Sequence, residues 1–292
     1  YCFMLKGSIV ALITPFKDDS LDEENYVKLI DYHLKNGTNG IVPGGTTGES
    51  PTLSHNEHKK IIEISVKECN KKIPVISGTG SNSTDEAIEL SKFAEKAGTD
   101  ALLIVTPYYN KPTQEGLYQH YKKINDNVGV PIIIYNIPSR SVIDMSVETM
   151  SKLYELKNII GVKDATGDLK RVELQKKSMG NEFIQLTGND DNALEFNKLG
   201  GVGAIGVTAN IAAKLSADFQ KACVEDKDKA ANLNRILQPL HSAMFIESNP
   251  SPVKYAASLL NMCKANVRLP LVEVKDTSKK IISDALKVAK LL

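Results

Sequence analysis

The sequence has 292 residues, of which 42% are hydrophobic and 24% are charged, and its formal net charge is +1. These proportions are ordinary for a globular chain and exclude a disordered or collagen-like one. Because 36 basic residues balance 35 acidic ones, no binding to nucleic acid or to an anionic membrane is expected. The sequence has no run of 18 apolar residues, so no membrane-spanning helix is predicted. The first residues lack the apolar segment of a signal peptide.

Short, continuously apolar runs recur roughly 20–35 residues apart, and a helical pattern follows each. Uninterrupted apolar character is typical of strands buried on both faces of a parallel sheet. The runs begin at Ser8, Gly40, Pro74, Ala101, Pro131, Ile159, Phe183 and Gly203. Helix boundaries are also marked: starts near Asp22, Ser54 and Ser83, and stops at Gly37 and Gly98.

Eight such units in about 225 residues predict an α/β fold, a (β/α)8 TIM barrel. A doubly wound sheet is the alternative, but it usually has fewer strands. Beyond residue 226 the strand pattern stops, and helices are expected at 230–245, 252–260 and 277–292. We therefore predict a barrel domain over residues 1–226 and a C-terminal three-helix appendage over 227–292.

The segments that follow the strands of a TIM barrel carry its chemistry. Here they hold small, hydroxyl and phenol groups, without a converging set of His, Asp and Glu and without a phosphate loop. The GxGxxG match at 201–206 lies within a strand instead of after one, and His55 and His58 lack the carboxylate of an HExxH motif. We expect neither a metal nor a cofactor. The scattered cysteines Cys2, Cys69, Cys223 and Cys263 predict reduced thiols in a cytoplasmic protein.

Lys163 stands within the apolar run IIGVKDAT, so its side chain is predicted to be buried in the barrel mouth. Burial disfavours the ammonium form and leaves a free amine that attacks carbonyl carbons to form a Schiff base. The alternative is a structural lysine paired with Asp164 or another barrel carboxylate, although adjacent strand residues face opposite ways. One unit earlier, the Tyr135 phenol ends the neighbouring strand, where it can transfer protons or serve as an ordinary strand aromatic.

Two loops carry groups that suit a carboxylate. Arg140 could bind one bidentately or be a solvated surface charge. The GGTTGES loop at 44–50 offers the hydroxyls of Thr46 and Thr47 with nearby backbone N–H groups, or is merely a tight turn.

Five motifs together resemble the dihydrodipicolinate synthase family of pyruvate-dependent class I aldolases. They are GGTTGES at 44–50, TPYYNKPTQEGLYQHY at 106–121, YNIPSR at 135–140, GVKDATGD at 161–168 and GAIGVTAN at 203–210. The similarity runs in order and spacing over residues 6–260.

The resemblance implies the condensation of pyruvate with L-aspartate 4-semialdehyde, in diaminopimelate and lysine biosynthesis. By position, Lys163 would form the pyruvate Schiff base and Tyr135 would donate and accept protons. Thr46 would link Tyr135 to Tyr109 in a proton relay, with Tyr109 reaching in from a neighbouring subunit. The family implies a homotetramer built as a dimer of dimers.

The same resemblance implies the substrate contacts. Thr47 would bind the pyruvate carboxylate and Arg140 that of the semialdehyde. Gly188 would line the pocket, with the Ile205 carbonyl near the substrate.

In members inhibited by L-lysine, the end product binds between two subunits. The matching positions are Ser50, His55, His58, Asn82, Glu86 and Tyr108. Glu86 could pair with an ammonium group, while Asn82 and Tyr108 could hydrogen-bond a carboxylate. Alternatively, Ser54-x-x-Glu57 and Ser83-x-x-Glu86 are only helix caps, and His55 and His58 are solvated helix residues.

Two rival functions remain open at this point. N-acetylneuraminate lyases and 2-keto-3-deoxy sugar-acid aldolases share the tyrosine and the lysine, but usually lack Arg140 and the paired threonines. A catalytically silent barrel that senses a keto acid is the second rival, and intact Lys163 and Tyr135 argue against it.

Overall fold

The computed structural model describes residues 4–292, so the prediction for Cys2 lies outside the described residues. Within that range eight parallel strands form one sheet in the order β4-β1-β10-β9-β8-β7-β6-β5. A bridge between Ile41 and Val75 joins its two edges and closes the barrel. The strands are β1 Gly7–Ala11, β4 Gly40–Val42, β5 Ile76–Gly78, β6 Ala101–Val105, β7 Ile132–Asn136, β8 Ile159–Asp164, β9 Ile184–Thr187 and β10 Gly203–Gly206.

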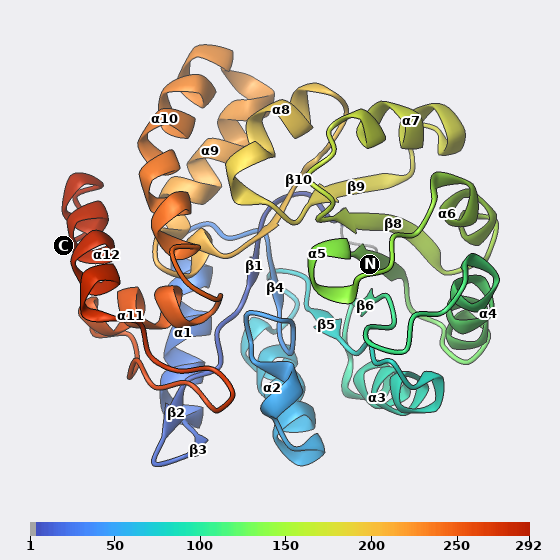
Figure 1. Ribbon diagram of the computed structural model, residues 1–292, viewed down its shortest axis with the longest axis horizontal. Coiled ribbons are helices and arrows are strands. Elements are labelled where there is room, and N and C mark those ends of the chain that lie inside the picture. Colours follow the sequence, from blue (N-terminus) through green and yellow to red (C-terminus); the bar gives the residue numbers. More distant parts are fainter. Residues whose placement is uncertain (1–3) are drawn as a thin grey trace.

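Helices follow the strands and surround them, as Figure 1 shows. They are α1 Glu23–Lys35, α2 His55–Cys69, α3 Thr84–Ala97, α4 Gln114–Asn125, α6 Val147–Tyr154, α7 Lys170–Met179, α8 Ala193–Lys198 and α9 Ala213–Glu225. Each of the eight predicted apolar runs overlaps one barrel strand, and the predicted TIM barrel is confirmed. A two-strand hairpin, β2 Phe16–Lys17 and β3 Ser20–Leu21, and the one-turn helix α5 Pro138–Ser141 were not predicted.

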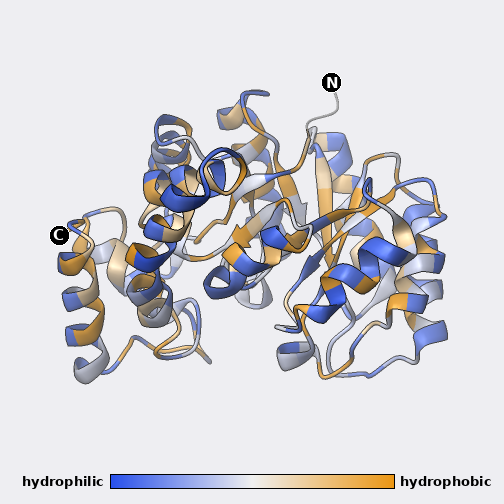
Figure 2. Cartoon of the chain, turned by 90° about the horizontal axis from the view of Figure 1, so that it is seen from above, coloured by the Kyte–Doolittle hydropathy of each residue, from blue (hydrophilic) through white to orange (hydrophobic). Residues whose placement is uncertain are grey.

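Alternation along the strands separates the barrel interior from the layer beneath the helices. Leu103 and Ile133 pack inside with Tyr135, while Ile104 and Ile134 pack outward against the helices. Figure 2 shows the apolar strands at the centre and hydrophilic residues on the surrounding helices. Since both faces of each strand are covered, the continuous apolar runs are explained.

The helix termini follow the sequence signals. Ser54 and Glu57 form a complete capping box at the start of α2. Ser83 accepts from the Glu86 backbone N–H at the start of α3. The Glu86 side chain, however, bonds elsewhere and does not complete a second box. Gly37 and Gly98 have φ values of +82° and +102°, as residues that end helices often do.

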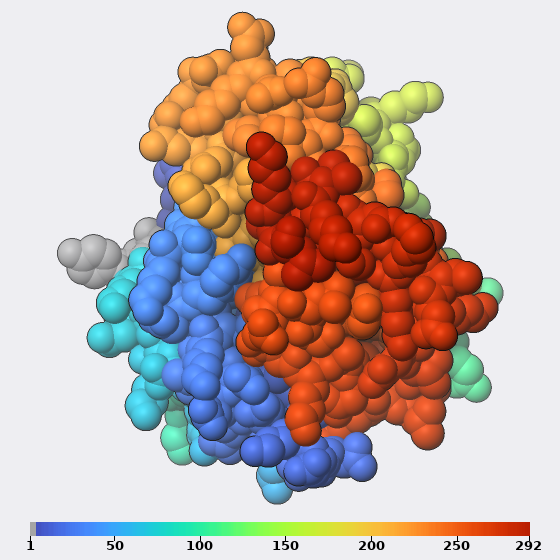
Figure 3. Space-filling view, turned by 90° about the vertical axis from the view of Figure 1, so that its left-hand side faces the viewer, coloured from blue at the N-terminus to red at the C-terminus, as the bar shows by residue number. Residues whose placement is uncertain are grey.

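Three helices follow the barrel: α10 Lys227–Met244, α11 Ser251–Leu259 and α12 Asp276–Val288. They pack beside α1 and α9 and share one apolar core with them. In Figure 3 the C-terminal segment lies directly against the surface of the N-terminal segment. The division at residue 226 falls between α9 and α10 and stays a prediction. In residues 4–292 no helix is long and apolar enough to cross a membrane.

Candidate active site

The carboxyl ends of β7 and β8 bring Lys163 and Tyr135 together. The two residues are register partners on these strands, and both side chains face the interior. The Lys163 amine lies 4.0 Å from the centre of the Tyr135 ring, and each residue is only 6% exposed. An ammonium group over a ring face is favourable, so this contact stabilises the position of the Lys163 side chain. The structure therefore places an amine and a phenol side by side at the barrel mouth.

Lys163 is not held as one half of a structural ion pair. Asp164, the candidate partner, accepts hydrogen bonds from the Thr166 backbone N–H at 2.9 Å and its hydroxyl at 2.6 Å. Within residues 4–292 no carboxylate oxygen lies within ion-pair distance, 4.0 Å, of the Lys163 amine. The lysine amine is therefore available for chemistry.

Gly188 provides the space that the lysine side chain occupies. A Cβ atom built on this glycine would lie 3.1 Å from Lys163 Cε and 2.8 Å from the Ala165 Cβ. Any larger residue at 188 would press on the Lys163 side chain. On β10, the strand next to β9, Ile205 points inward and is buried.

The loop over residues 44–50 is held from several sides. Gly44 begins it with φ of +70°, and a Cβ there would lie 2.4 Å from the Nε2 atom of His58. Thr47 is buried, and its hydroxyl accepts from the Asn249 amide at 3.0 Å. Thr46 is partly buried, and its carbonyl accepts from the Glu49 N–H.

Arg140 and Tyr109 lie at the surface. Arg140, on α5, is exposed and donates to the Asn249 carbonyl at 3.3 Å. Tyr109 is 89% exposed with φ of +74°, so its side chain has little contact within its own chain. The structure therefore brings together Lys163 and Tyr135, links Thr47 to Arg140 through Asn249, and leaves Tyr109 apart.

Four of the six residues predicted to bind L-lysine form two hydrogen-bonded pairs, near the starts of α2 and α3. His55 Nε2 donates to Glu86 at 2.8 Å, and the Ser81 hydroxyl donates to the other Glu86 oxygen. The hydroxyl and then His55 hold the pKa of Glu86 below its usual range. Asn82 donates to the Tyr108 carbonyl at 3.0 Å.

His58 does not fit the picture of a solvated helix residue, and that alternative is wrong for it. It is buried and donates from Nε2 to the Gly78 carbonyl at 2.7 Å. Burial lowers its pKa. Ser50, at the end of the 44–50 loop, is partly buried. His58 therefore supports the start of this loop instead of facing solvent.

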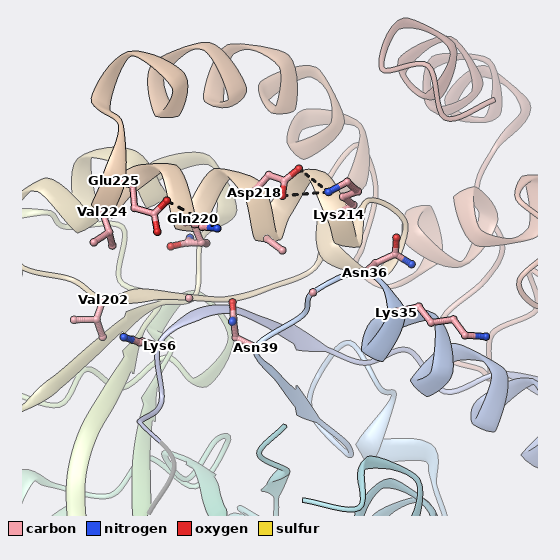
Figure 4. Close-up of a pocket in the computed structure, with 14 residues that line it drawn as sticks. Lys6, Lys35, Asn36, Asn39, Val202, Lys214, Asp218, Gln220, Val224 and Glu225 are labelled. Atoms are coloured by element: carbon pink, nitrogen blue, oxygen red, sulfur yellow. Dashed lines mark hydrogen bonds and ion pairs between the residues drawn. The ribbon is translucent and has the colours of Figure 1, made fainter. Parts of the chain in front are cut away.

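A sizeable cavity lies at the other end of the barrel, far from Lys163 along the strands. It has a volume of about 540 Å³ and is lined at the amino-terminal ends of β1 and β10 by Gly7 and Val202. Figure 4 shows Lys6 and Asn39 at its edge and the ion pair of Lys214 with Asp218 beside it. In the described residues no group of three or more His, Cys, Asp or Glu side chains could hold a metal ion.

The sequence patterns did not identify three polar residues that lie around the site. They are Asn249, which bonds Thr47 and Arg140, and the buried pair of Glu49 with Lys254. A signal for Lys254 was present, because it lies among apolar residues in the helical stretch PVKYAASL. The pattern that indicated Lys163 could therefore also have indicated Lys254. Asn249 gave no such signal, because its role depends on a contact between segments about 200 residues apart.

The chain was compared with known proteins. The model of the "Dihydrodipicolinate synthetase family" matches residues 4–289. A 4-hydroxy-tetrahydrodipicolinate synthase of Pelagibacter ubique is 69% identical, with 99% of this chain and 100% of the relative covered. A solved structure from Acinetobacter baumannii is that of a chloride-inhibited dihydrodipicolinate synthase complexed with pyruvate. It superposes with a TM-score of 0.97 at 45% identity and covers 99% of this chain and 100% of that one.

A related structure, from Cyanidioschyzon merolae, has lysine bound. It superposes with a TM-score of 0.95 at 33% identity and covers 98% of this chain and 99% of that one. Both the fold and the sequence agree with these relatives over nearly their full length. The chain therefore belongs to the dihydrodipicolinate synthase family.

Proposed function

We propose that this chain is a 4-hydroxy-tetrahydrodipicolinate synthase, a lyase that condenses pyruvate with L-aspartate 4-semialdehyde. The observation that carries the proposal is the buried Lys163 amine, 4.0 Å from the Tyr135 ring and without a carboxylate partner in residues 4–292. Relatives that are 54–69% identical over nearly the whole chain carry this enzyme's name. The reaction serves diaminopimelate and lysine biosynthesis.

The chemistry follows from the two groups. The Lys163 amine attacks the C2 carbonyl of pyruvate, and the carbinolamine loses water to give the Schiff base. The Tyr135 phenol supplies and accepts the protons of that step. Loss of a C3 proton gives an enamine, which forms a carbon–carbon bond to the aldehyde carbon of the second substrate. The semialdehyde's own amino group then displaces Lys163 and closes the ring.

Two carboxylates must be held during these steps. Thr47 binds that of pyruvate, with the Ile205 carbonyl and Gly188 lining the pocket. Arg140 binds that of the semialdehyde at the entrance, where a bidentate guanidinium contact is favourable. The link from Arg140 through the Asn249 carbonyl, with the Asn249 amide on Thr47, supports a common framework for both contacts.

A coupled assay tests this function directly. We expect turnover with pyruvate and L-aspartate 4-semialdehyde and none with N-acetylneuraminate or a 2-keto-3-deoxy sugar acid run in parallel. Arg140→Lys keeps the charge but loses the planar fork, so it is expected to raise the KM for the semialdehyde more than that for pyruvate. Cleavage of a sugar acid without condensation would contradict the proposal. Pyruvate binding without any turnover would instead indicate a sensing barrel.

Tyr109 completes the relay of a neighbouring subunit in this proposal. Its exposed side chain supports a role outside its own chain. The active unit is then at least a dimer, and the family resemblance favours a homotetramer.

Free thiols at Cys69, Cys223 and Cys263 agree with a reducing compartment, and we place the protein in the cytoplasm. Release with a periplasmic marker on cell fractionation would contradict that location.

Mixing two inactive variants tests the shared site. Lys163→Ala lacks the nucleophile and Tyr109→Phe lacks the donated hydroxyl. In a mixed dimer, one site has its own Lys163 and receives Tyr109 from the other subunit. After subunit exchange at equal amounts, about a quarter of wild-type activity is expected. No recovery in a mixture that sedimentation shows to contain mixed oligomers would place Tyr109 outside the relay.

L-lysine is proposed as an inhibitor that binds near Glu86, Asn82 and Tyr108. Binding beside Tyr108 would disturb the adjacent Tyr109 and so couple two distinct sites. The ammonium group would have to displace or share the contacts that Glu86 makes with His55 and Ser81, which supports partial inhibition only.

The expected result is a partial fall in initial rate across millimolar L-lysine, relieved in Glu86→Ala. Glu89→Ala is the matched control, since Glu89 lies on the same helix and pairs with Lys59. Unchanged rates with the wild-type chain would show that L-lysine does not regulate it.

A further inference from the structure

A buried ion pair joins the 44–50 loop to the C-terminal helices. The Lys254 amine on α11 donates to Glu49 Oε2 at 2.7 Å, and both side chains are 0% exposed. The other carboxylate oxygen of Glu49 accepts from the Arg268 backbone N–H at 3.0 Å. Burial lowers the pKa of Lys254, and the Glu49 carboxylate partly offsets that effect. Both oxygens of Glu49 are therefore bound by residues more than 200 positions away.

Glu49 is tied in turn to the threonines of the loop. Its backbone N–H donates to the Thr46 carbonyl at 3.0 Å, and its carbonyl accepts from the Thr52 N–H at 3.1 Å. Its φ of +58° is unusual for a residue with a Cβ atom and persists only where surrounding contacts impose it. The Glu49 backbone is therefore bonded to Thr46, while the Glu49 side chain is bonded to the C-terminal segment.

The same C-terminal segment reaches the loop a second time. Asn249, five residues before Lys254, donates from its side-chain amide to the Thr47 hydroxyl at 3.0 Å. Thr47 and Glu49 are thus both held by the segment that leads into and forms α11. Replacing a buried ion pair with apolar residues is often neutral for stability, so stability alone is a weak reason for Glu49 and Lys254.

We propose that the Glu49–Lys254 pair positions Thr46 and Thr47, so that the C-terminal helices form part of the catalytic framework. Glu49 and Lys254 are positioning residues, since neither faces the Lys163 amine, whose neighbours are Tyr135 and Gly188. This inference rests on the proposed function, in which Thr47 binds the pyruvate carboxylate and Thr46 relays protons. The alternative is that the pair only docks the helices on the barrel.

The Arg268–Glu57 pair provides a control for docking. Arg268 donates to both Glu57 oxygens, at 2.7 and 2.6 Å, and so fixes the same C-terminal segment to α2. The Arg268 guanidinium also donates to the Thr52 carbonyl but contacts neither Thr46 nor Thr47, and the bond from the Arg268 backbone N–H to Glu49 does not involve Glu57. Glu57→Gln should therefore weaken docking and leave the geometry of Thr46 and Thr47 intact.

The test compares Lys254→Met, the double variant Glu49→Gln/Lys254→Met and Glu57→Gln. The double variant leaves no unpaired buried charge, so it is expected to fold even if Lys254→Met does not. Two readouts are used: the rate of borohydride trapping of pyruvate on the enzyme at subsaturating pyruvate, and the KM and kcat of the condensation from rates measured over a range of pyruvate concentrations.

For the double variant we expect the KM for pyruvate to rise and the trapping rate to fall by ~10- to 100-fold, with a melting temperature near that of the wild type. Glu57→Gln is expected to trap pyruvate at the wild-type rate. Wild-type trapping and KM in the double variant, or an equal loss in Glu57→Gln, would overturn the inference. A wild-type chain that traps pyruvate but does not condense the semialdehyde would overturn the proposed function alone, because trapping still measures the effect of the pair.

Discussion

Lys163→Ala is expected to lower kcat for the condensation by at least a thousandfold, about 4 kcal/mol of barrier. The variant lacks the amine that forms the covalent bond with pyruvate in the proposed mechanism. Folding should be unaffected, because the Lys163 amine makes no ion pair in residues 4–292 that its removal would break. Steady-state kinetics and a thermal melt measure the two effects.

Lys157→Ala is the matched control for this variant. Lys157 lies six residues before Lys163, is exposed, and precedes β8 instead of forming part of it. Its replacement should leave kcat unchanged. If Lys163→Ala retained most of its activity, another amine would have to form the Schiff base.

Tyr135→Phe is expected to lower kcat by about 10²- to 10⁴-fold, the usual contribution of a positioned proton donor. The substitution keeps the ring that lies 4.0 Å from the Lys163 amine, so only the hydroxyl is lost. Pyruvate should still be trapped on Lys163, but more slowly, because dehydration of the carbinolamine needs a proton.

Tyr154→Phe controls for the loss of a phenol hydroxyl elsewhere. Tyr154 packs edge-on against Phe183 beneath the helices, with 4.9 Å between ring centres, and lies outside the barrel mouth. It should have wild-type kinetics. An unchanged kcat in Tyr135→Phe would assign proton transfer to another group, such as ordered water.

The periodic features of the sequence were sufficient to predict the barrel. Eight apolar runs predicted eight strands because each strand is covered on both faces. Lys163 was identified as a candidate because a lysine within such a buried run is unusual. The register of Tyr135 with Lys163 followed from their positions at the ends of consecutive strands. These properties depend on neighbours along the chain or on adjacent strands.

The contacts that shape the 44–50 loop could not be predicted in this way. Asn249 and Lys254 meet the loop across more than 200 residues, and the path of the chain between the C-terminal helices decides which of their side chains reach it. The burial of His58 could not be predicted either. Its ring occupies the space that a Cβ atom on Gly44 would fill, and no helical pattern indicates such a contact. Local spacing predicts a helix there but not the contacts of its side chains.

In the proposed mechanism pyruvate forms a Schiff base on Lys163, and borohydride trapping followed by peptide mass spectrometry detects that bond itself. Incubation of the wild-type chain with pyruvate and borohydride is predicted to add one reduced pyruvyl group, on the peptide that contains Lys163, and Lys163→Ala is predicted to stay unlabelled. A label on any other lysine, or no label in a wild-type chain that condenses both substrates, would contradict the mechanism.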